Sequence, residues 1–234
     1  MQLPTLSGEF VLMLLEAAAV LVSAIAGMLV ASTKRMDVVG AYALAIVNAF
    51  GGGTVRDLLL DHRPFYWMEH WVFLVAILAI CIPFVYNARM YRLASEVHRR
   101  SFRVDAIGLA LFTITGVGIA LEQGRPLIVA VLMGVITGTM GGMLRDIVVN
   151  EIPDLFRPGA LYATASFTGG LAFVAALENE LRYSYAAALG IAVVILLRWV
   201  SASHGITVPA PQWSDQQSKA QAGQGVKKSK PRIF

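Results

Sequence analysis

Gly52-Gly53-Thr54-Val55-Arg56-Asp57 returns 89 positions later as Gly141-Gly142-Met143-Leu144-Arg145-Asp146. Four further pairs keep the same offset: Glu16 and Asp105, Ile25 and Ile114, Gly27 and Gly116, and Pro64 and Pro153. A fixed offset over many positions indicates a repeated structural unit, which changes the interpretation of the whole chain. The sequence therefore predicts a duplicated unit, with its functional region between the two copies.

The composition around both motifs is that of a membrane protein. Hydrophobic residues make up 57% of the chain and charged residues 15%, against roughly 25% charged in soluble domains. A helix needs about 20 apolar residues to cross a hydrocarbon core of about 30 Å. Seven runs approach this length: 10–31, 38–60, 70–86, 104–121, 126–149, 160–177 and 183–203. They lack the alternation of membrane β-strands, so we expect an all-α integral membrane protein with seven transmembrane helices.

The lysines and arginines predict the orientation. If the amino terminus lies outside, 14 of the 19 basic residues fall in inner segments, and the outer loops keep only Arg63, Arg125 and Arg182. Basic residues are retained on the cytoplasmic side of a membrane. We therefore expect an outside amino terminus and a cytoplasmic carboxy terminus. The net charge of +4 then reflects this bias and attraction to anionic lipids, and no nucleic-acid partner is expected.

The repeat divides the predicted transmembrane domain, residues 1–204. Repeat one covers about residues 8–92, repeat two about 97–182, and a seventh helix spans 183–203. Because each copy has three helices, the second must enter from the opposite side of the membrane. Such inverted repeats occur in transport proteins, with the site near the middle of the bilayer. Residues 205–234 are rich in Pro, Gln, Lys, Ser and Gly, which predicts a disordered cytoplasmic tail.

Glycines interrupt the second and fifth predicted helices. A glycine inside a helix costs about 1 kcal/mol relative to alanine, and unwound backbone persists in lipid only where protein buries it or it lines a watery cavity. We therefore expect both helices to break at the glycines and to open a wet passage between them. The candidate passage residues are Gly51, Gly52, Gly53, Gly138, Gly141, Gly142, Asn48, Thr54, Thr137 and Thr139.

Close packing is the alternative explanation of these glycines. Two small-residue faces, Ala45-x3-Ala49-x3-Gly53 and Gly134-x3-Gly138-x3-Gly142, have the spacing that lets membrane helices touch. Packing and passage are compatible, because such faces would bring the second and fifth helices together.

Charged residues follow the glycines inside both helices: Arg56, Asp57, Arg145 and Asp146. A charge within a span costs about 3 kcal/mol by insertion scales, so it normally faces a partner or water. Because the two helices run in opposite directions, we expect each arginine to pair within its own repeat, Arg56 with Glu16 and Arg145 with Asp105. Two roles stay open for these charges: salt bridges that lock each repeat, or electropositive constrictions that gate permeation.

Other functional signatures are missing from the sequence. The histidines show no paired ligand spacing for a metal, and no phosphate loop, nucleophile elbow or cofactor fingerprint is present. We therefore expect no metal site, no catalytic residue and no enzymatic activity. Tyr66 and Trp67 are predicted to belong to an interfacial aromatic belt, and Cys81 to be a packing residue.

The duplicated Gly-Gly-x-x-Arg-Asp motif, the three-plus-three-plus-one helices and the outside amino terminus resemble the trimeric intracellular cation channel family, in its prokaryotic branch. The resemblance covers about residues 8 to 203. It implies a homotrimer in the cell inner membrane, with one pore through each protomer along the kinked second and fifth helices. It also implies conduction of potassium and other monovalent cations. Membrane lipids are the other expected partners. No cofactor is expected, and permeating K+ or Na+ would bind in the pore.

Two other functions stay open. Helix amino termini carry partial positive charge, and the nearby arginines add to it, which suits a carboxylate group. A secondary transporter of a small amino acid such as glycine is therefore the second hypothesis. A membrane scaffold without transport activity is the third.

Overall fold

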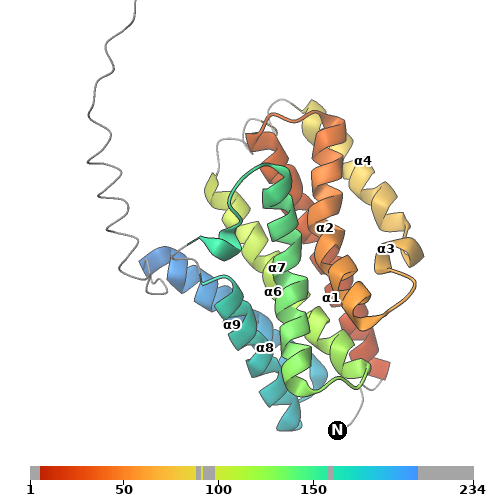
Figure 1. The fold of residues 1–234 in the computed structure, drawn as a ribbon, viewed down its shortest axis with the longest axis vertical. Helices are drawn as coiled ribbons and strands as arrows, with labels where there is room; N and C mark the ends of the chain where they lie inside the picture. Colours follow the sequence, from red (N-terminus) through yellow and green to blue (C-terminus); the bar gives the residue numbers. More distant parts are fainter. Residues whose placement is uncertain (1–5, 88–90, 92–97, 158–160, 205–234) are drawn as a thin grey trace, which may run out of the picture.

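The computed structural model describes residues 6–87, 91, 98–157 and 161–204, and the regular structure in these ranges is helical (Figure 1). The predicted tail, 205–234, lies outside them. The helices are α1 (Leu6–Thr33), α2 (Val38–Leu60), α3 (Tyr66–Glu69), α4 (Val72–Tyr86), α6 (His98–Glu122), α7 (Leu127–Val148), the 3-10 turn η1 (Asp154–Phe156), α8 (Ala163–Glu178) and α9 (Tyr183–His204).

Helices form at all seven predicted apolar runs, but they are not equally long. Five are long and apolar enough to cross a membrane, namely α1, α2, α6, α7 and α9. The other two, α4 and α8, have 15 and 16 residues. At about 1.5 Å per residue they reach about 24 Å, less than a hydrocarbon core of about 30 Å. The predicted all-α membrane class is confirmed, with five full-length spans and two shorter apolar helices.

The two halves share their turns at the offset of the sequence motif. Backbone with positive φ occurs at Arg35 and Gly124, and again at Asp61 and Asn150, and both pairs are 89 positions apart. The shared turns show that α6 and α7 of the second half are equivalent to α1 and α2 of the first half. In Figure 1, α1 and α6 run in opposite directions, and so do α2 and α7.

Helix α6 lies at the centre of the fold. It contacts α1, α7, α8 and α9, and its residues Ala110, Ile114 and Val117 are fully buried. The unrepeated helix α9 packs on α8 and α6. Repeat two is therefore covered by a helix that has no counterpart in repeat one, which makes the two halves chemically different.

The predicted helix breaks are wrong for this structure. Helix α2 is continuous through Gly51, Gly52 and Gly53, and α7 is continuous through Gly141 and Gly142. The physical reason is that other parts of the fold pack against Gly51, Gly52, Gly141 and Gly142, so the backbone keeps its helical hydrogen bonds. The missing side chains serve close approach instead of unwinding.

Candidate functional site

The two glycine motifs meet where α2 and α7 cross. A Cβ added to Gly141 would lie 2.5 Å from the carbonyl oxygen of Asn48, and one added to Gly52 would collide with the carbonyl oxygen of Thr137. Asn48 and Thr137 are themselves 89 positions apart, so the contact is reciprocal. Because only glycine leaves room for such an approach, α2 and α7 touch backbone to backbone at this crossing.

The other small residues pack differently from the prediction. A Cβ on Gly134 or Gly138 would meet the backbone of α6, at Thr113 and Leu109 respectively, and Gly27 of α1 lies against Ala45. These small-residue faces therefore hold α2 and α7 against the first helix of their own repeat. The expectation that they join α2 to α7 is wrong, because Gly52 and Gly141 make that contact.

The polar side chains near the crossing are engaged within the protein. The Asn48 amide donates to the Ser23 carbonyl oxygen at 2.6 Å, which ties α2 to α1. The hydroxyls of Thr137 and Thr139 donate to carbonyl oxygens one turn earlier in α7, a common arrangement for threonine in membrane helices. Asn48 therefore links two helices, whereas the two threonines are satisfied within α7. Thr54 faces a cavity.

The first charged cluster joins Glu16, Arg56 and Asp57. Arg56 Nη2 lies 2.9 Å from Glu16 Oε1, and Arg56 Nε donates to Asp57 Oδ1 at 2.7 Å. The Asp57 carboxylate also accepts from the Tyr66 backbone N–H at 3.4 Å, which fixes the start of α3. The Arg56 side chain is only 1% exposed, so the predicted Glu16–Arg56 pair is confirmed as a buried contact.

The second cluster repeats this geometry. Arg145 Nη1 lies 2.7 Å from Asp105 Oδ1, and Arg145 Nε donates to Asp146 Oδ1 at 2.9 Å. Asp146 in turn accepts from the Asp154 backbone N–H at the start of η1. The predicted Asp105–Arg145 pair is therefore confirmed, and each arginine bridges α7 or α2 to the first helix of its own repeat.

Arg198 is a member of the second cluster that the sequence analysis missed. It is one of the 14 basic residues that the orientation argument placed in inner segments, yet it is 1% exposed in α9. Its Nη2 lies 3.7 Å from Asp105 Oδ2, and its guanidinium stacks over the Tyr162 ring. A lone charge inside the apolar run 183–203 was the available signal, since such charges normally have a partner.

The clusters consequently differ in charge. Repeat one has two carboxylates and one arginine, whereas α9 supplies a second arginine to the two carboxylates of repeat two. With ionised side chains, the first cluster has a net charge of −1 and the second is neutral. A buried excess charge is unfavourable unless a partner or water compensates it.

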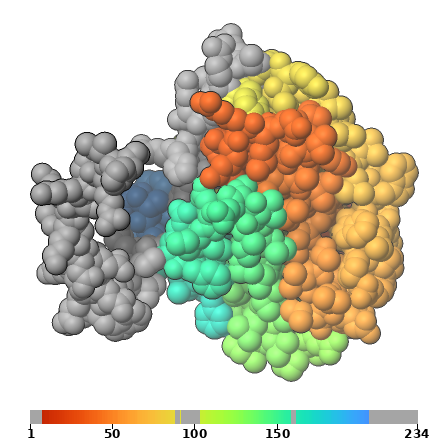
Figure 2. All heavy atoms as spheres, turned by 45° about the horizontal axis from the view of Figure 1, so that its top comes forward, coloured from red at the N-terminus to blue at the C-terminus, as the bar shows by residue number. Residues whose placement is uncertain are grey.

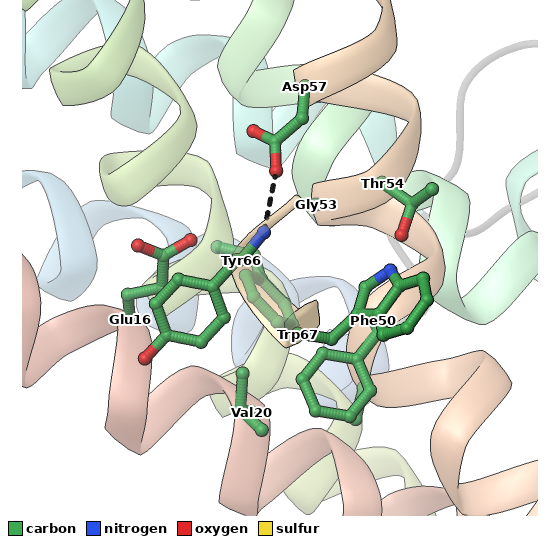
Figure 3. A pocket seen from close by; sticks show the side chains of 10 residues that line it. Glu16, Val20, Phe50, Gly53, Thr54, Asp57, Tyr66 and Trp67 are labelled. Carbon is green, nitrogen blue, oxygen red and sulfur yellow. Dashed lines mark hydrogen bonds between the residues drawn. The ribbon is translucent and has the colours of Figure 1, made fainter. Parts of the chain in front are cut away.

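A small cavity lies beside the first cluster (Figure 3). Its volume of about 10 Å³ is close to the minimum that holds one water molecule. Residues of α1, α2, α3 and α6 line it: Glu16, Val20, Ala49, Phe50, Gly53, Thr54, Asp57, Tyr66, Trp67 and Phe112. Tyr66 and Trp67 thus face this cavity, in addition to the membrane-interface position that their place in the chain predicted.

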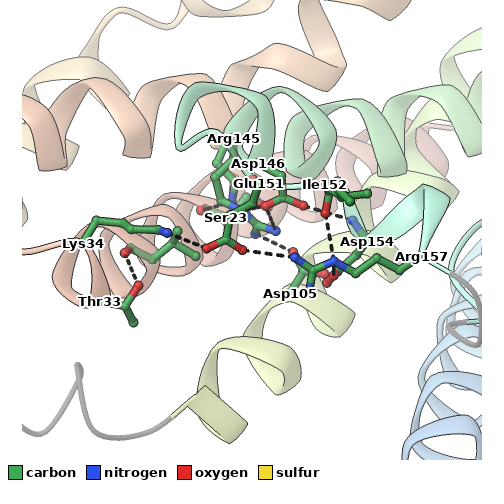
Figure 4. A network of polar contacts seen from close by, with 12 residues as sticks. Ser23, Thr33, Lys34, Asp105, Arg145, Asp146, Glu151, Ile152, Asp154 and Arg157 are labelled. Carbon is green, nitrogen blue, oxygen red and sulfur yellow. Dashed lines mark hydrogen bonds and ion pairs between the residues drawn. The ribbon is translucent and has the colours of Figure 1, made fainter. Parts of the chain in front are cut away.

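An ionic link joins the two repeats at one end of the molecule (Figure 4). Lys34, between α1 and α2, pairs with Glu151 at 2.5 Å, and Arg157 pairs with the same carboxylate at 3.1 Å. The hydrogen bond from Lys34 lowers the pKa of Glu151. Figure 2 shows the chain around residue 35 in contact with the chain around residue 150. The positions equivalent to Lys34 and Glu151 are Gln123 and His62, so the repeat does not reproduce this charge pair at the equivalent positions.

Comparisons with known proteins agree with this architecture. The chain is 35% identical over 190 residues to the UPF0126 inner membrane protein YadS of Escherichia coli (strain K12). The aligned region covers 80% of this chain and 90% of YadS. It is 38% identical over 178 residues to a UPF0126 membrane protein of Vibrio cholerae, covering 76% and 73% of the two chains. Its fold matches the TRIC trimeric intracellular cation channel orthologue from Rhodobacter sphaeroides with a TM-score of 0.77, at 35% identity, over 84% of this chain and 99% of that chain.

The fold thus defines a multi-pass helical membrane protein of the TRIC channel architecture, and the resemblance to the prokaryotic branch is confirmed. The chain belongs to the family whose model is described as Glycine transporter. That model matches the chain twice, over residues 13–88 and 102–178, so the two halves resemble the same model.

Proposed function

We propose that this protein is a channel for monovalent cations, chiefly potassium, which works as a homotrimer with one pore in each protomer. The observation that carries the proposal is the likeness to the Rhodobacter sphaeroides channel orthologue, with 35% identity across nearly that whole chain. The match extends over 84% of this chain and 99% of that chain, and not only over a short motif.

The proposed pathway runs along α2 and α7, between two repeats of inverted orientation. These helices carry the glycine motifs and the buried charges, and they cross through reciprocal contacts. Because their backbones touch at Gly52 and Gly141, conduction along this interface requires the helices to separate or rotate. Glycine presents little surface, so such a movement breaks few van der Waals contacts.

The charge balance favours cations. In the first cluster the carboxylates of Glu16 and Asp57 outnumber the guanidinium of Arg56. Carboxylates in a membrane pathway attract cations and repel anions. The neutral second cluster does not oppose this preference.

The second candidate is a carrier of a small amino acid, and the description of the matching family model favours it. A carrier needs a site large enough for its substrate, and the cavity beside Glu16 has room for about one water molecule. Glycine transport would therefore require a conformation with a wider site. This candidate predicts saturable uptake coupled to an ion gradient.

Planar-bilayer recording of the purified protein separates the two candidates. A potassium channel gives discrete conductance steps whose reversal potential follows the K+ gradient. Saturable glycine uptake into vesicles without conductance steps would overturn the channel proposal. Arg56→Ala and Arg145→Ala test the role of the charges: altered conductance supports gating, whereas unchanged conductance with lowered stability leaves only the structural role.

We also propose an outside amino terminus in the prokaryotic inner membrane. Arg63 and Ile152 occupy equivalent exposed positions after α2 and α7, and a single cysteine can replace either residue in a Cys81→Ser background. A membrane-impermeant maleimide applied to intact cells should label Arg63→Cys, and should label Ile152→Cys only after permeabilisation. The reverse pattern would contradict the orientation.

A further inference from the structure

We propose that a proton on His62 joins the two repeats at the end of the molecule opposite the Lys34–Glu151 pair. In the protonated state His62 donates from Nδ1 to Asp57 and from Nε2 to Gln123 Oε1. This link holds α2 against α6 and restrains the movement that conduction along α2 and α7 requires. Regulation by protons rests on the proposed channel function, whereas the link itself does not.

The first argument is the internal symmetry of the chain. The offset of 89 relates Lys34 to Gln123 and His62 to Glu151. Lys34 contacts Glu151 at 2.5 Å, where the turn after α1 lies beside the segment after α7. The equivalent segments are the turn after α6 and the segment after α2, which carry Gln123 and His62. The repeat therefore places these two residues on facing segments at the other end.

The packing at this end supports the same arrangement. Leu60, the last residue of α2, belongs to one buried apolar cluster with Ile119, near the end of α6. Helices α2 and α6 are in contact, and both end at the lower side of the molecule in Figure 1. His62 also interacts electrostatically with Glu122, the residue directly before Gln123. The ends of the two helices are therefore close enough for side chains to meet.

The second argument is an unused acceptor on α6. Gln123 Oε1 is buried, and none of the residues that the structure describes donates a hydrogen bond to it. A buried acceptor without a donor destabilises the folded protein. A neutral histidine ring has one N–H and an imidazolium has two. Protonated His62 can therefore serve Gln123 and Asp57 at the same time, which the neutral ring cannot do.

The third argument is the contact that His62 already makes. Its Nδ1 lies 3.5 Å from Asp57 Oδ1, and its side chain is half exposed, so protons reach it from solvent. A positive charge on the ring strengthens this contact. Histidine ordinarily changes charge between pH 5 and pH 8, so the link forms on mild acidification. The other charged or titratable groups near this end are Asp61, Glu122, Glu9, Glu16, Arg56, Arg63 and His70.

The first test is thermal unfolding of the full-length protein in detergent between pH 8 and pH 6. Stability rises on acidification wherever the folded state binds more protons than the unfolded state. A link that needs protonated His62 should therefore raise the unfolding midpoint as the pH falls. We expect about a fivefold higher folded-to-unfolded ratio at pH 6, the effect of about one hydrogen bond. The absence of any acid gain in the parent protein would overturn the proposal.

Three variants locate the proton and its acceptor. His62→Asn removes the titrating ring and should abolish the acid gain. Gln123→Leu keeps a side chain of similar size without the buried acceptor, so it should be as stable as the parent at pH 8 and lose much of the gain. The matched control is His70→Asn, whose ring stacks on Tyr66 at the same end, and which should keep the gain.

Two results with these variants would contradict the assignment. A full acid gain in His62→Asn would assign the proton to another group, such as the carboxyl of Glu16 or Glu122. An unchanged gain in Gln123→Leu would mean that protonated His62 does not join α2 to α6. In either case the proposed link fails, because it needs both residues.

Planar-bilayer recording tests the regulation. Acidifying the side that His62 faces from pH 8 to pH 6 should lower the ratio of open to closed times by up to about fivefold, the same free energy as the link. His62→Asn should not respond, and acidifying the other side should have no effect. Currents that are insensitive to acid on both sides would overturn the regulation. Absent currents at every pH, with the acid gain in stability retained, would refute the channel function and leave the link intact.

Discussion

Replacing Gly141 by alanine tests the backbone contact between α2 and α7. The added Cβ would lie 2.5 Å from the carbonyl oxygen of Asn48, and ordinary contact begins at 3.4 Å. The helices would therefore have to separate by about 0.9 Å at their crossing. Both sides of the contact are helical backbone, so no side-chain rotation can relieve the clash.

Two opposing effects set the magnitude. Alanine gains about 1 kcal/mol over glycine in helix propensity. Overpacking typically costs about 1–3 kcal/mol, and a contact between two backbones lies at the upper end of that range. We therefore expect Gly141→Ala to lose about 1–2 kcal/mol of stability. The control is Gly53→Ala, whose Cβ has its nearest neighbour at 3.8 Å, and which should gain up to about 1 kcal/mol.

The assay is thermal unfolding of both variants in the same detergent without K+. For a chain of this size, about 1 kcal/mol corresponds to roughly 2–4 °C, so the two unfolding midpoints should differ by several degrees in opposite directions from the parent protein. Equal stability of Gly141→Ala and Gly53→Ala would refute the reasoning, because it would mean that α2 and α7 do not touch at this point.

Other variants test the second glycine of the crossing, the buried arginines and the link between Lys34 and Glu151. Gly52→Ala should destabilise the protein more than Gly141→Ala in the same assay, since its Cβ approaches the Thr137 carbonyl oxygen more closely. Arg56→Met should destabilise the protein more than Arg145→Met. Breaking a buried ion pair costs about 3–5 kcal/mol, but in Arg145→Met the Arg198 guanidinium still faces Asp105. Equal losses of thermal stability would contradict this. Lys34 lowers the pKa of Glu151. The stabilisation by this pair is therefore complete above the ordinary glutamate pKa of 4.5 and is lost as the pH falls below it. The loss should be less than about 1 kcal/mol, because the site is partly exposed. Between pH 6 and pH 4 the unfolding midpoint of Glu151→Gln should therefore fall less than that of the parent protein. An identical pH response in the two proteins would exclude this contribution of the Lys34–Glu151 pair.

The partners of the two buried arginines could be predicted from the sequence. The offset of 89 relates Glu16 to Asp105 and Arg56 to Arg145, and the cost of a lone charge in a span requires a partner. Opposite helix directions then leave the first helix of each repeat as the place of that partner. The Arg56–Glu16 and Arg145–Asp105 distances of 2.9 Å and 2.7 Å agree with this reasoning.

The state of the glycines could not be predicted, because two competing effects depend on neighbours. A glycine weakens a helix by about 1 kcal/mol, but it also permits a close contact that stabilises the helix from outside. The sequence shows Gly52 and Gly141, but it does not show which groups approach them. In the structure these are the carbonyl groups of Thr137 and Asn48. Packing decides between a break and a continuous helix, and here the helices are continuous.

Sequence alone determined the membrane class, the duplication and the pairing within each repeat, because these depend on residue type, run length and a fixed offset. Tertiary structure decided what distinguishes the two halves. Helix α9 has no counterpart in the repeat, so no offset could indicate that Arg198 reaches Asp105. The same holds for the cavity beside Glu16, which exists because α3 and α6 pack around a carboxylate that repeat one leaves without a second cation. Contacts between helices distant in the chain depend on how their surfaces fit together, and that fit is a property of the folded protein.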